Sequence, residues 1–199
     1  HSVFGTDNAV AYFPTVLGGW VVSEENFLKD SEAVNFLKFR ASYGVLGNDK
    51  IGENRYKGLL NGEAEYVFDN TLTSGRALGT LPNTGLKWEE ARKFDVGLDS
   101  KFFNNHIDFT TDFFIEKRYN LLIEALPVSG ITGVGAPGGG APTQNAGTIV
   151  NKGLEVSLGY TGKIGNDFNF TASVNYTTIK NEVTEVRSPN KYLQGGSFG

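Results

Sequence analysis

The chain has 199 residues, a formal net charge of −4 and a pI of about 5.3, so it is long enough for one sizeable domain and too acidic for nucleic acid to be its main partner. It contains no cysteine, which excludes a disulfide framework and a thiolate metal site. No run of about 18 apolar residues exists, which excludes a transmembrane helix, and 26 glycines against 6 prolines are typical of an all-β chain with many turns.

Three elements are expected in the first quarter of the chain. Residues 11–22 favour a strand, although both of its faces are apolar and Pro14 marks a break or an end. Residues 23–29 favour a short helix, because Ser23 can cap it and two glutamates lie in its first turn. Residues 37–45 alternate strictly between apolar and polar side chains, which predicts a strand.

Residues 47–88 are expected to be a long connection. A loop of this length is uncommon in a compact domain and is usually functional. We expect a short strand at residues 66–68 within it.

Residues 89–116 alternate on both sides of Asn104-Asn105, which predicts a β-hairpin. Asparagine tolerates the left-handed conformation, so these two residues suit a two-residue turn. Such a turn pairs residues whose numbers sum to an odd value. The predicted opposed pairs are Val96 with Phe113, Phe94 with Ile115, and Lys101 with Asp108.

Residues 151–183 predict a second hairpin, in which the apolar residues of both arms have even numbers. That parity requires a loop of odd length, and residues 165–167 fit as a three-residue turn. The predicted opposed pairs are Leu158 with Val174 and Val156 with Tyr176. A slip by one residue would move every apolar side chain to the wrong face.

The second long connection, residues 124–150, contains the string Gly-Val-Gly-Ala-Pro-Gly at 133–138. The glycine spacing matches that of a dinucleotide-binding loop, but that loop must lead into a helix. Pro137 and the glycines after it disfavour a helix, so we interpret the string as part of an outer loop.

Connections alternate between short and long along the chain. The short ones are residues 23–35, 104–105 and 165–167, and the long ones are residues 47–88, 124–150 and 184–199. The hairpin arms run to about 13 residues, whereas about 9–11 suffice to cross a bilayer. Long strands with short turns at one end and long loops at the other predict an all-β fold, an antiparallel meander forming part of a large transmembrane β-barrel.

The order and spacing of several short motifs resemble the SusC/RagA family of TonB-linked outer-membrane transporters of Bacteroidetes. The motifs occupy residues 12–16, 19–20, 23–27, 37–44, 47–49, 86–89, 94–99, 145–147 and 151–156. Each motif alone is weak, and together they extend over nearly the whole chain.

The resemblance implies that residues 1–199 are a segment of a longer receptor, about six strands of a barrel of roughly 22. It implies no enzymatic activity and no cofactor. It further implies import of glycan oligosaccharides or peptides across the outer membrane of a Gram-negative bacterium, in contact with lipid bilayer and lipopolysaccharide. The implied partners are a SusD-like surface lipoprotein and TonB, the latter through a plug segment that lies outside this chain.

In such a barrel the alternation assigns side chains to two environments. We expect lipid to be contacted by Leu154, Val156, Leu158, Val174, Phe94, Val96, Phe109 and Phe113. We expect the lumen to be lined by Asp95, Asp99, Asp112, Glu155, Ser157, Asn169 and Asn175. The loops 47–88 and 124–150 are then expected to contact substrate or the lipoprotein.

Other functions remain open from the sequence alone. A soluble β-sandwich module that binds carbohydrate would place the apolar faces between two sheets. The carboxylates of residues 95–116 also suit a hydrolase or a cation site, although the wet wall of a lumen is the simpler interpretation. His106 lies at a turn, which favours a solvated side chain over a metal ligand.

Overall fold

The computed structural model of the chain describes residues 4, 8–50, 56–60, 62–123, 140–165 and 167–187. The elements found there are β1 (Thr15–Val21), η2 (Val22–Glu24), β2 (Val34–Asn48), β3 (Gly62–Phe68), β4 (Thr71–Ala77), β5 (Glu89–Phe102), β6 (Ile107–Ile123), β7 (Gln144–Ile164) and β8 (Phe168–Val186). Among the described residues, no helix is long and apolar enough to cross a membrane.

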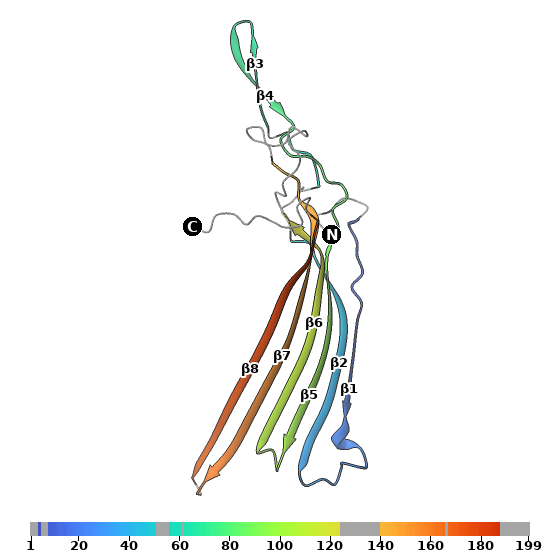
Figure 1. Cartoon of the computed structure of the whole chain (residues 1–199), viewed down its shortest axis with the longest axis vertical. Helices are drawn as coiled ribbons and strands as arrows, with labels where there is room; N and C mark the ends of the chain where they lie inside the picture. Colours follow the sequence, from blue (N-terminus) through green and yellow to red (C-terminus); the bar gives the residue numbers. More distant parts are fainter. Residues whose placement is uncertain are drawn as a thin grey trace.

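Six strands form one antiparallel sheet in the order β1-β2-β5-β6-β7-β8, and β3 and β4 pair separately. Apart from the inserted β3 and β4, each strand lies beside its neighbour in sequence, which confirms the predicted meander. Figure 1 shows a tall, curved sheet with the tight turns gathered at its lower end, here called the turn end. The upper end, called the loop end, is where β2 leads toward β5 and β6 leads toward β7, and the β3–β4 hairpin stands beyond it (Figure 1).

The registers of the two predicted hairpins are confirmed. The observed opposed pairs are Val96 with Phe113, Phe94 with Ile115, Lys101 with Asp108, Leu158 with Val174 and Val156 with Tyr176. Between β5 and β6 the turn has four residues, 103–106, instead of the predicted two. Three of them have left-handed backbones, because φ is 52° at Phe103, 57° at Asn104 and 63° at Asn105. Gly165 begins the other turn with φ of +63°.

The strands extend further into the predicted loops than the sequence indicates. β7 begins at Gln144, inside the expected loop 124–150, and β8 continues to Val186, inside the expected loop 184–199. The register of β7 on β8 shifts between Thr148 and Ile149, which interrupts the alternation of side chains on which the prediction depends. Residues 124–139, with their glycine-rich string, and residues 188–199 lie outside the described residues.

The expected connection 47–88 contains regular structure. β2 continues to Asn48, and β3 and β4 form a hairpin around a tight turn at Asp69 and Asn70, whose φ values are 47° and 60°. The predicted strand at residues 66–68 is the end of β3. The alternation of β3 is hard to recognise because Glu65, Tyr66, Val67 and Phe68 include apolar residues on both faces.

The short helix expected at residues 23–29 is a single 3₁₀ turn, Val22–Glu24, and Ser23 does not cap it. Val21 is the N-cap and makes no side-chain hydrogen bond. Glu25 instead accepts a hydrogen bond from Trp20 Nε1 at 2.8 Å, which ties the turn back to β1.

Little of the sheet is covered by other parts of the described chain. The buried apolar residues are Phe4, Leu86 and Ala146 together with Val22, which lies next to β1. Large apolar side chains are exposed along all six strands, including Leu17, Phe39, Phe94, Phe113, Leu158 and Val174. The described strands therefore do not form the two packed sheets that the alternative of a β-sandwich requires.

Candidate functional site: the two faces of the sheet

The cross-strand register sorts the predicted residues onto two faces, because directly opposed residues of an antiparallel pair share a face. One face, the apolar face, carries all eight residues expected to contact lipid. For example, Leu154 lies opposite Phe113, which lies opposite Val96. The other face, the polar face, carries all seven residues expected to line the lumen, as when Glu155 lies opposite Asp112.

The apolar face is exposed to the surroundings. Val174 is 70% exposed, and Leu158, Phe94 and Phe113 are each exposed by more than two fifths. Contiguous apolar surface of this extent is rare on soluble monomers and marks contact with another apolar phase or surface. The sheet is therefore built to be covered on this face by something outside the described chain.

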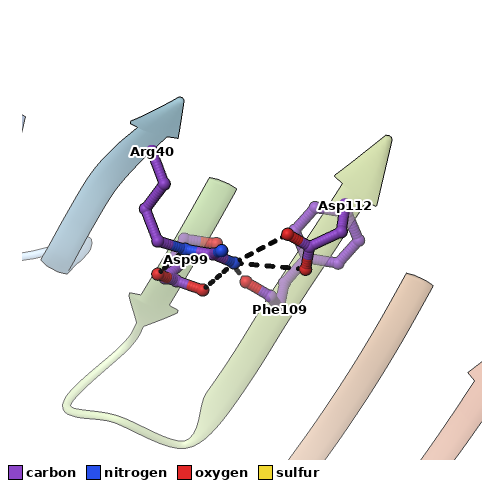
Figure 2. A network of polar contacts seen from close by, with 5 residues as sticks. Arg40, Asp99, Phe109 and Asp112 are labelled. Atoms are coloured by element: carbon purple, nitrogen blue, oxygen red, sulfur yellow. Dashed lines mark hydrogen bonds and ion pairs between the residues drawn. The ribbon is translucent and has the colours of Figure 1, made fainter. Parts of the chain in front are cut away.

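The polar face is organised by one arginine that bridges three strands (Figure 2). Arg40 on β2 donates from Nε to Asp99 Oδ2 at 2.7 Å and from Nη2 to Asp99 Oδ1 at 3.0 Å. The same Nη2 donates to Asp112 Oδ2 on β6 at 3.1 Å. The fork of the guanidinium thus holds one carboxylate with two donors and reaches a second, which is a stronger arrangement than a single lysine contact.

Gly97 makes this bridge possible. It lies on β5 directly between Arg40 and Asp112 in the register. A Cβ at this position would be 2.4 Å from Asp112 Oδ1 and 2.7 Å from Arg40 Cζ. Only glycine leaves the space through which the guanidinium crosses the strand.

Sequence reasoning found Asp99 and Asp112 but not Arg40. The register of β2 on β5 sets this contact, and the two strands are separated by a connection of about 40 residues whose length does not fix a register. A glycine inside a strand often marks close approach of another group, so Gly97 was the available signal.

A shallow depression of about 210 Å³ lies on the polar face beside the arginine. Its lining includes four of the residues predicted to face the lumen, Asp112, Glu155, Ser157 and Asn175, together with Thr110, Val156 and Thr177. Glu155 lies directly opposite Asp112, and like charges in such a pair repel each other. Among the described residues, Glu155 has no ion-pair partner, so this depression is acidic.

A second depression, of about 200 Å³, lies on the other side of the arginine, between β1, β2 and β5. Arg40, Lys38, Ser42 and the predicted residue Asp95 contribute to its lining. Lys93 Nζ lies 3.6 Å from Asp95 Oδ2. The two depressions thus differ in charge, because the cations lie on the β1 side and the unpaired carboxylate lies on the β7 side.

The remaining predicted residues lie apart from this centre. Asn169 is opposite Lys163 near the turn end and lines neither depression. Lys101 Nζ is 3.5 Å from Asp108 Oδ2, which confirms the predicted cross-strand pair. His106 Nδ1 lies 2.6 Å from the carbonyl oxygen of Thr161, so the imidazole joins the turn to β7.

The arrangement does not favour hydrolysis. Asp99 and Asp112 accept hydrogen bonds from the same guanidinium, so both carboxylates already take part in a structural contact. Among the described residues, no three metal-ligating side chains gather as a metal site requires. The polar face presents hydrogen-bonding groups that suit contact with polar molecules or with other polar protein surface.

Comparison with known proteins assigns the family. Residues 26–197 match the family model described as "TonB dependent receptor-like, beta-barrel". The chain belongs to the TonB-dependent receptor family. Receptors of this family are outer-membrane transporters and are not enzymes, so the segment is part of an outer-membrane β-barrel.

Two relatives show which branch of the family is similar. The chain is 34% identical over 190 residues to the TonB-dependent receptor SusC of Bacteroides thetaiotaomicron, and 32% identical over 185 residues to the TonB-dependent receptor P26 of Formosa agariphila. Each alignment covers 93% of this chain and 18% of the relative. The chain therefore spans less than a fifth of the length of these receptors and is homologous to the SusC/RagA group.

Solved structures agree with this assignment. The structure of the RagAB peptide transporter matches with a TM-score of 0.76 and 28% identity, covering 92% of this chain and 19% of that one. The RagAB peptide importer in its closed-closed state matches with a TM-score of 0.79 over 94% of this chain and 20% of that one, also at 28% identity. The six-stranded sheet is thus a piece of barrel wall.

Proposed function

We propose that this segment forms part of the wall of an importer that takes up oligosaccharides or peptides together with a SusD-like surface lipoprotein. The observation that carries the proposal is the meander itself, whose two faces differ in chemistry from the turn end up to the level of Val96, Phe113 and Leu154. Energy would reach the barrel from TonB through a plug segment outside this chain. The RagAB structures support a two-protein assembly and a peptide cargo for a homologue of the segment.

In this proposal the apolar face contacts lipid and the polar face borders the lumen. An exposed apolar face is stable in hydrocarbon, and a face with Arg40, Asp99 and Asp112 is stable against water or a polar plug. Charged side chains on the lipid face of a barrel are destabilising by about 2–4 kcal/mol at mid-membrane, so the opposite assignment would be costly. Asp95, Glu155, Ser157, Asn169 and Asn175 then also face the lumen.

The connections at the loop end are the proposed contact region for substrate or lipoprotein. The β3–β4 hairpin supports this, because it projects beyond the sheet and neither of its faces is covered by the described chain (Figure 1). Tyr66 and Phe68 are 72% and 70% exposed, and both lie on the face that also carries Thr71 and Thr73. Exposed aromatic rings beside hydroxyl groups suit protein or sugar contacts.

Labelling of single cysteines in the intact receptor tests the facing. We expect Glu155→Cys and Ser157→Cys to react with a water-soluble maleimide in outer membranes, and Leu154→Cys and Val156→Cys to react only after detergent denaturation. The four positions are consecutive, so they share the same depth and expression background. Labelling of the two apolar positions without labelling of the polar ones would overturn the assignment.

Purification of the receptor in mild detergent tests the partner. We expect a lipoprotein of the SusD type, identified by mass spectrometry, to remain bound to the receptor. We also expect the double variant Tyr66→Ser/Phe68→Ser to retain less of it than Val67→Ser/Leu72→Ser, which removes two apolar side chains from the opposite face of the same hairpin. Equal retention by both variants would show that Tyr66 and Phe68 do not contact the lipoprotein. Absence of the lipoprotein from the native receptor would contradict the proposed assembly.

A further inference from the structure

Three of the motifs that resemble the SusC/RagA family meet at the loop end of the sheet. Phe13, from the first motif, lies edge-on to Trp88 with ring centroids 5.3 Å apart. The second motif, residues 86–89, contains Trp88 and also Leu86, which is completely buried. The third motif, residues 145–147, contains Ala146, which is buried as well. Trp88 Nε1 donates to the carbonyl oxygen of Asn8 at 2.9 Å, which brings the N-terminal segment to the same place.

Asn145 connects these motifs through its amide group. Its Oδ1 accepts a hydrogen bond from the Lys87 backbone N–H at 2.9 Å, and its Nδ2 donates to the Lys87 carbonyl oxygen at 2.9 Å. Nδ2 also donates to the carbonyl oxygen of Asn120 at 2.8 Å. A side-chain amide carries the same donor and acceptor as a peptide group, so Asn145 pairs with the backbone of Lys87 as a neighbouring strand would.

The Asn120 carbonyl can accept a hydrogen bond from Asn145 because β6 is irregular at this position. The register of β6 on β7 shifts between Arg118 and Leu121, and Asn120 has φ of 55°. The shift frees the Asn120 carbonyl from the regular ladder, which would otherwise have occupied it. Asn145, at the start of β7, therefore contacts both the segment that leads into β5 and the last residues of β6.

Further contacts continue this connection away from the sheet. Asn83 Nδ2 donates to the carbonyl oxygen of Thr143 at 2.8 Å, and the Gly140 N–H donates to the carbonyl oxygen of Gly79 at 2.7 Å. Thr80 forms isolated bridges to both Gly140 and Leu59. The segment 79–87, which leads from the β3–β4 hairpin, thus lies along the segment 140–145, which leads into β7.

We propose that Asn145 is a positioning residue that fastens the two long connections to each other, so that the β3–β4 hairpin and the entry to β7 move as one unit. The pairing of Lys87 with Asn145, 58 residues apart, is the point at which this contact is anchored to the sheet. If the proposed function is correct, a ligand or lipoprotein bound to one connection is then sensed by the other. We call this set of contacts, residues 79–88 and 140–146 with Leu59 and Asn120, the loop base.

Hydrogen exchange of the intact receptor, in detergent and without ligand, tests the fastening. In Asn145→Ala we expect the Gly79 and Gly140 amides, which make no contact with Asn145, to exchange together about tenfold faster or more, because the anchor of their segments is lost. The matched control is Asn181→Ala, because Asn181 is an exposed residue of β8 whose side-chain amide donates to the side chain of Asn151 on β7, away from the loop base. Acceleration at Lys87 alone, with Gly79 and Gly140 unchanged, would show that Asn145 serves only its own neighbours and would overturn the proposal.

A cross-link gives a second measurement that does not depend on transport or on the partner. A Cβ added at Gly140 would lie 3.5 Å from Thr80 Oγ1, so Thr80→Cys/Gly140→Cys places two thiols in contact, in a segment that has no native cysteine. We expect rapid oxidation to the disulfide in outer membranes, slowed several-fold by Asn145→Ala and also by the isosteric Asn145→Asp, which retains the acceptor but loses both donations. Unchanged rates in both backgrounds would overturn the proposal, even if the receptor has no SusD-like partner.

Discussion

The wall of the sheet and the loop base satisfy the same backbone chemistry in different ways. In the wall, neighbouring strands satisfy each other's N–H and C=O groups through a ladder that is continuous between β5 and β6 and shifts register once between β7 and β8, and the side chains of both faces point away from the sheet. In the loop base, side-chain amides such as those of Asn83 and Asn145 form hydrogen bonds with backbone groups that have no neighbouring strand, and apolar residues are buried between segments. The wall therefore depends on its surroundings for cover, whereas the loop base carries its own small core.

This difference determines where single substitutions act. Truncating an apolar side chain of the wall removes contacts with lipid or with neighbouring parts of the receptor. Truncating one in the loop base leaves a cavity among residues of this chain, which cannot be refilled by lipid. Three predictions test the contrast.

The largest effect is expected for Leu86→Ala. Leu86 is completely buried in the loop base, and removing a buried leucine side chain costs about 2–5 kcal/mol. We expect the free energy of local opening, measured by hydrogen exchange at residues 83–88, to fall by this order. Leu60→Ala is the matched control, since Leu60 lies in the same connection and is 62% exposed, and it is expected to change stability by less than about 0.5 kcal/mol. Equal effects of the two variants would show that the loop base has no core of its own.

A smaller effect is expected for Gly153→Ala in the wall. A Cβ at Gly153 would be 2.6 Å from the ring of Phe114 and 2.8 Å from the carbonyl oxygen of Thr178, and the second atom belongs to the β8 backbone. Overpacking of this kind costs about 1–3 kcal/mol, so we expect a lower thermal unfolding temperature of the receptor in detergent. Faster exchange around residues 177–179 is expected to accompany it.

Gly159→Ala is the control on the same strand and the same face. A Cβ there would make ordinary contacts, at 3.6 Å from Asp108 Cβ. The substitution is therefore expected to be neutral, or to stabilise by about 0.5 kcal/mol because alanine lowers the conformational entropy of the unfolded chain. A stability loss at both glycines would indicate that the sheet is intolerant of any added side chain, and that the close approach of Phe114 is not the cause.

The same contrast explains how much the sequence predicts. Within the wall, face and register follow from two local quantities, the alternation of side chains and the parity of a short turn, so pairs such as Val96–Phe113 and Leu158–Val174 were predictable. The separation of Asp95, Asp99, Asp112, Glu155, Ser157, Asn169 and Asn175 onto one face follows from the same alternation. Their lumen contact stays a prediction, since it depends on the rest of the barrel.

The loop base was not predictable from local patterns. The sequence Asn-Ala-Gly-Thr before Ile149 has the composition of a loop, yet it begins β7, because β6 and β8 pair with it across register shifts. The contact of Asn145 with Lys87 joins residues that no local rule brings together. The role of Arg40 was not predicted for a related reason, because a connection of about 40 residues separates its strand, β2, from β5, which carries Asp99.

The smallest effect is expected for Arg40→Gln on the polar face. Arg40 is about one third exposed, and ion pairs in such positions contribute only about 0.2–1 kcal/mol, with the bidentate geometry favouring the upper part of that range. Removing the guanidinium also leaves Asp99, Asp112 and Glu155 on neighbouring strands without a shared cation. We therefore expect a stability loss near 1 kcal/mol that shrinks as salt screens the carboxylates, measured as the unfolding temperature at about 0.05 M and about 0.5 M salt. Arg118→Gln removes an arginine whose ion pair, with Glu116, lies within one strand, and it is expected to show neither the loss nor the salt dependence. A salt-independent loss in Arg40→Gln would mean that the arginine stabilises β2, β5 and β6 by packing of its stem across Gly97 instead of by its charge.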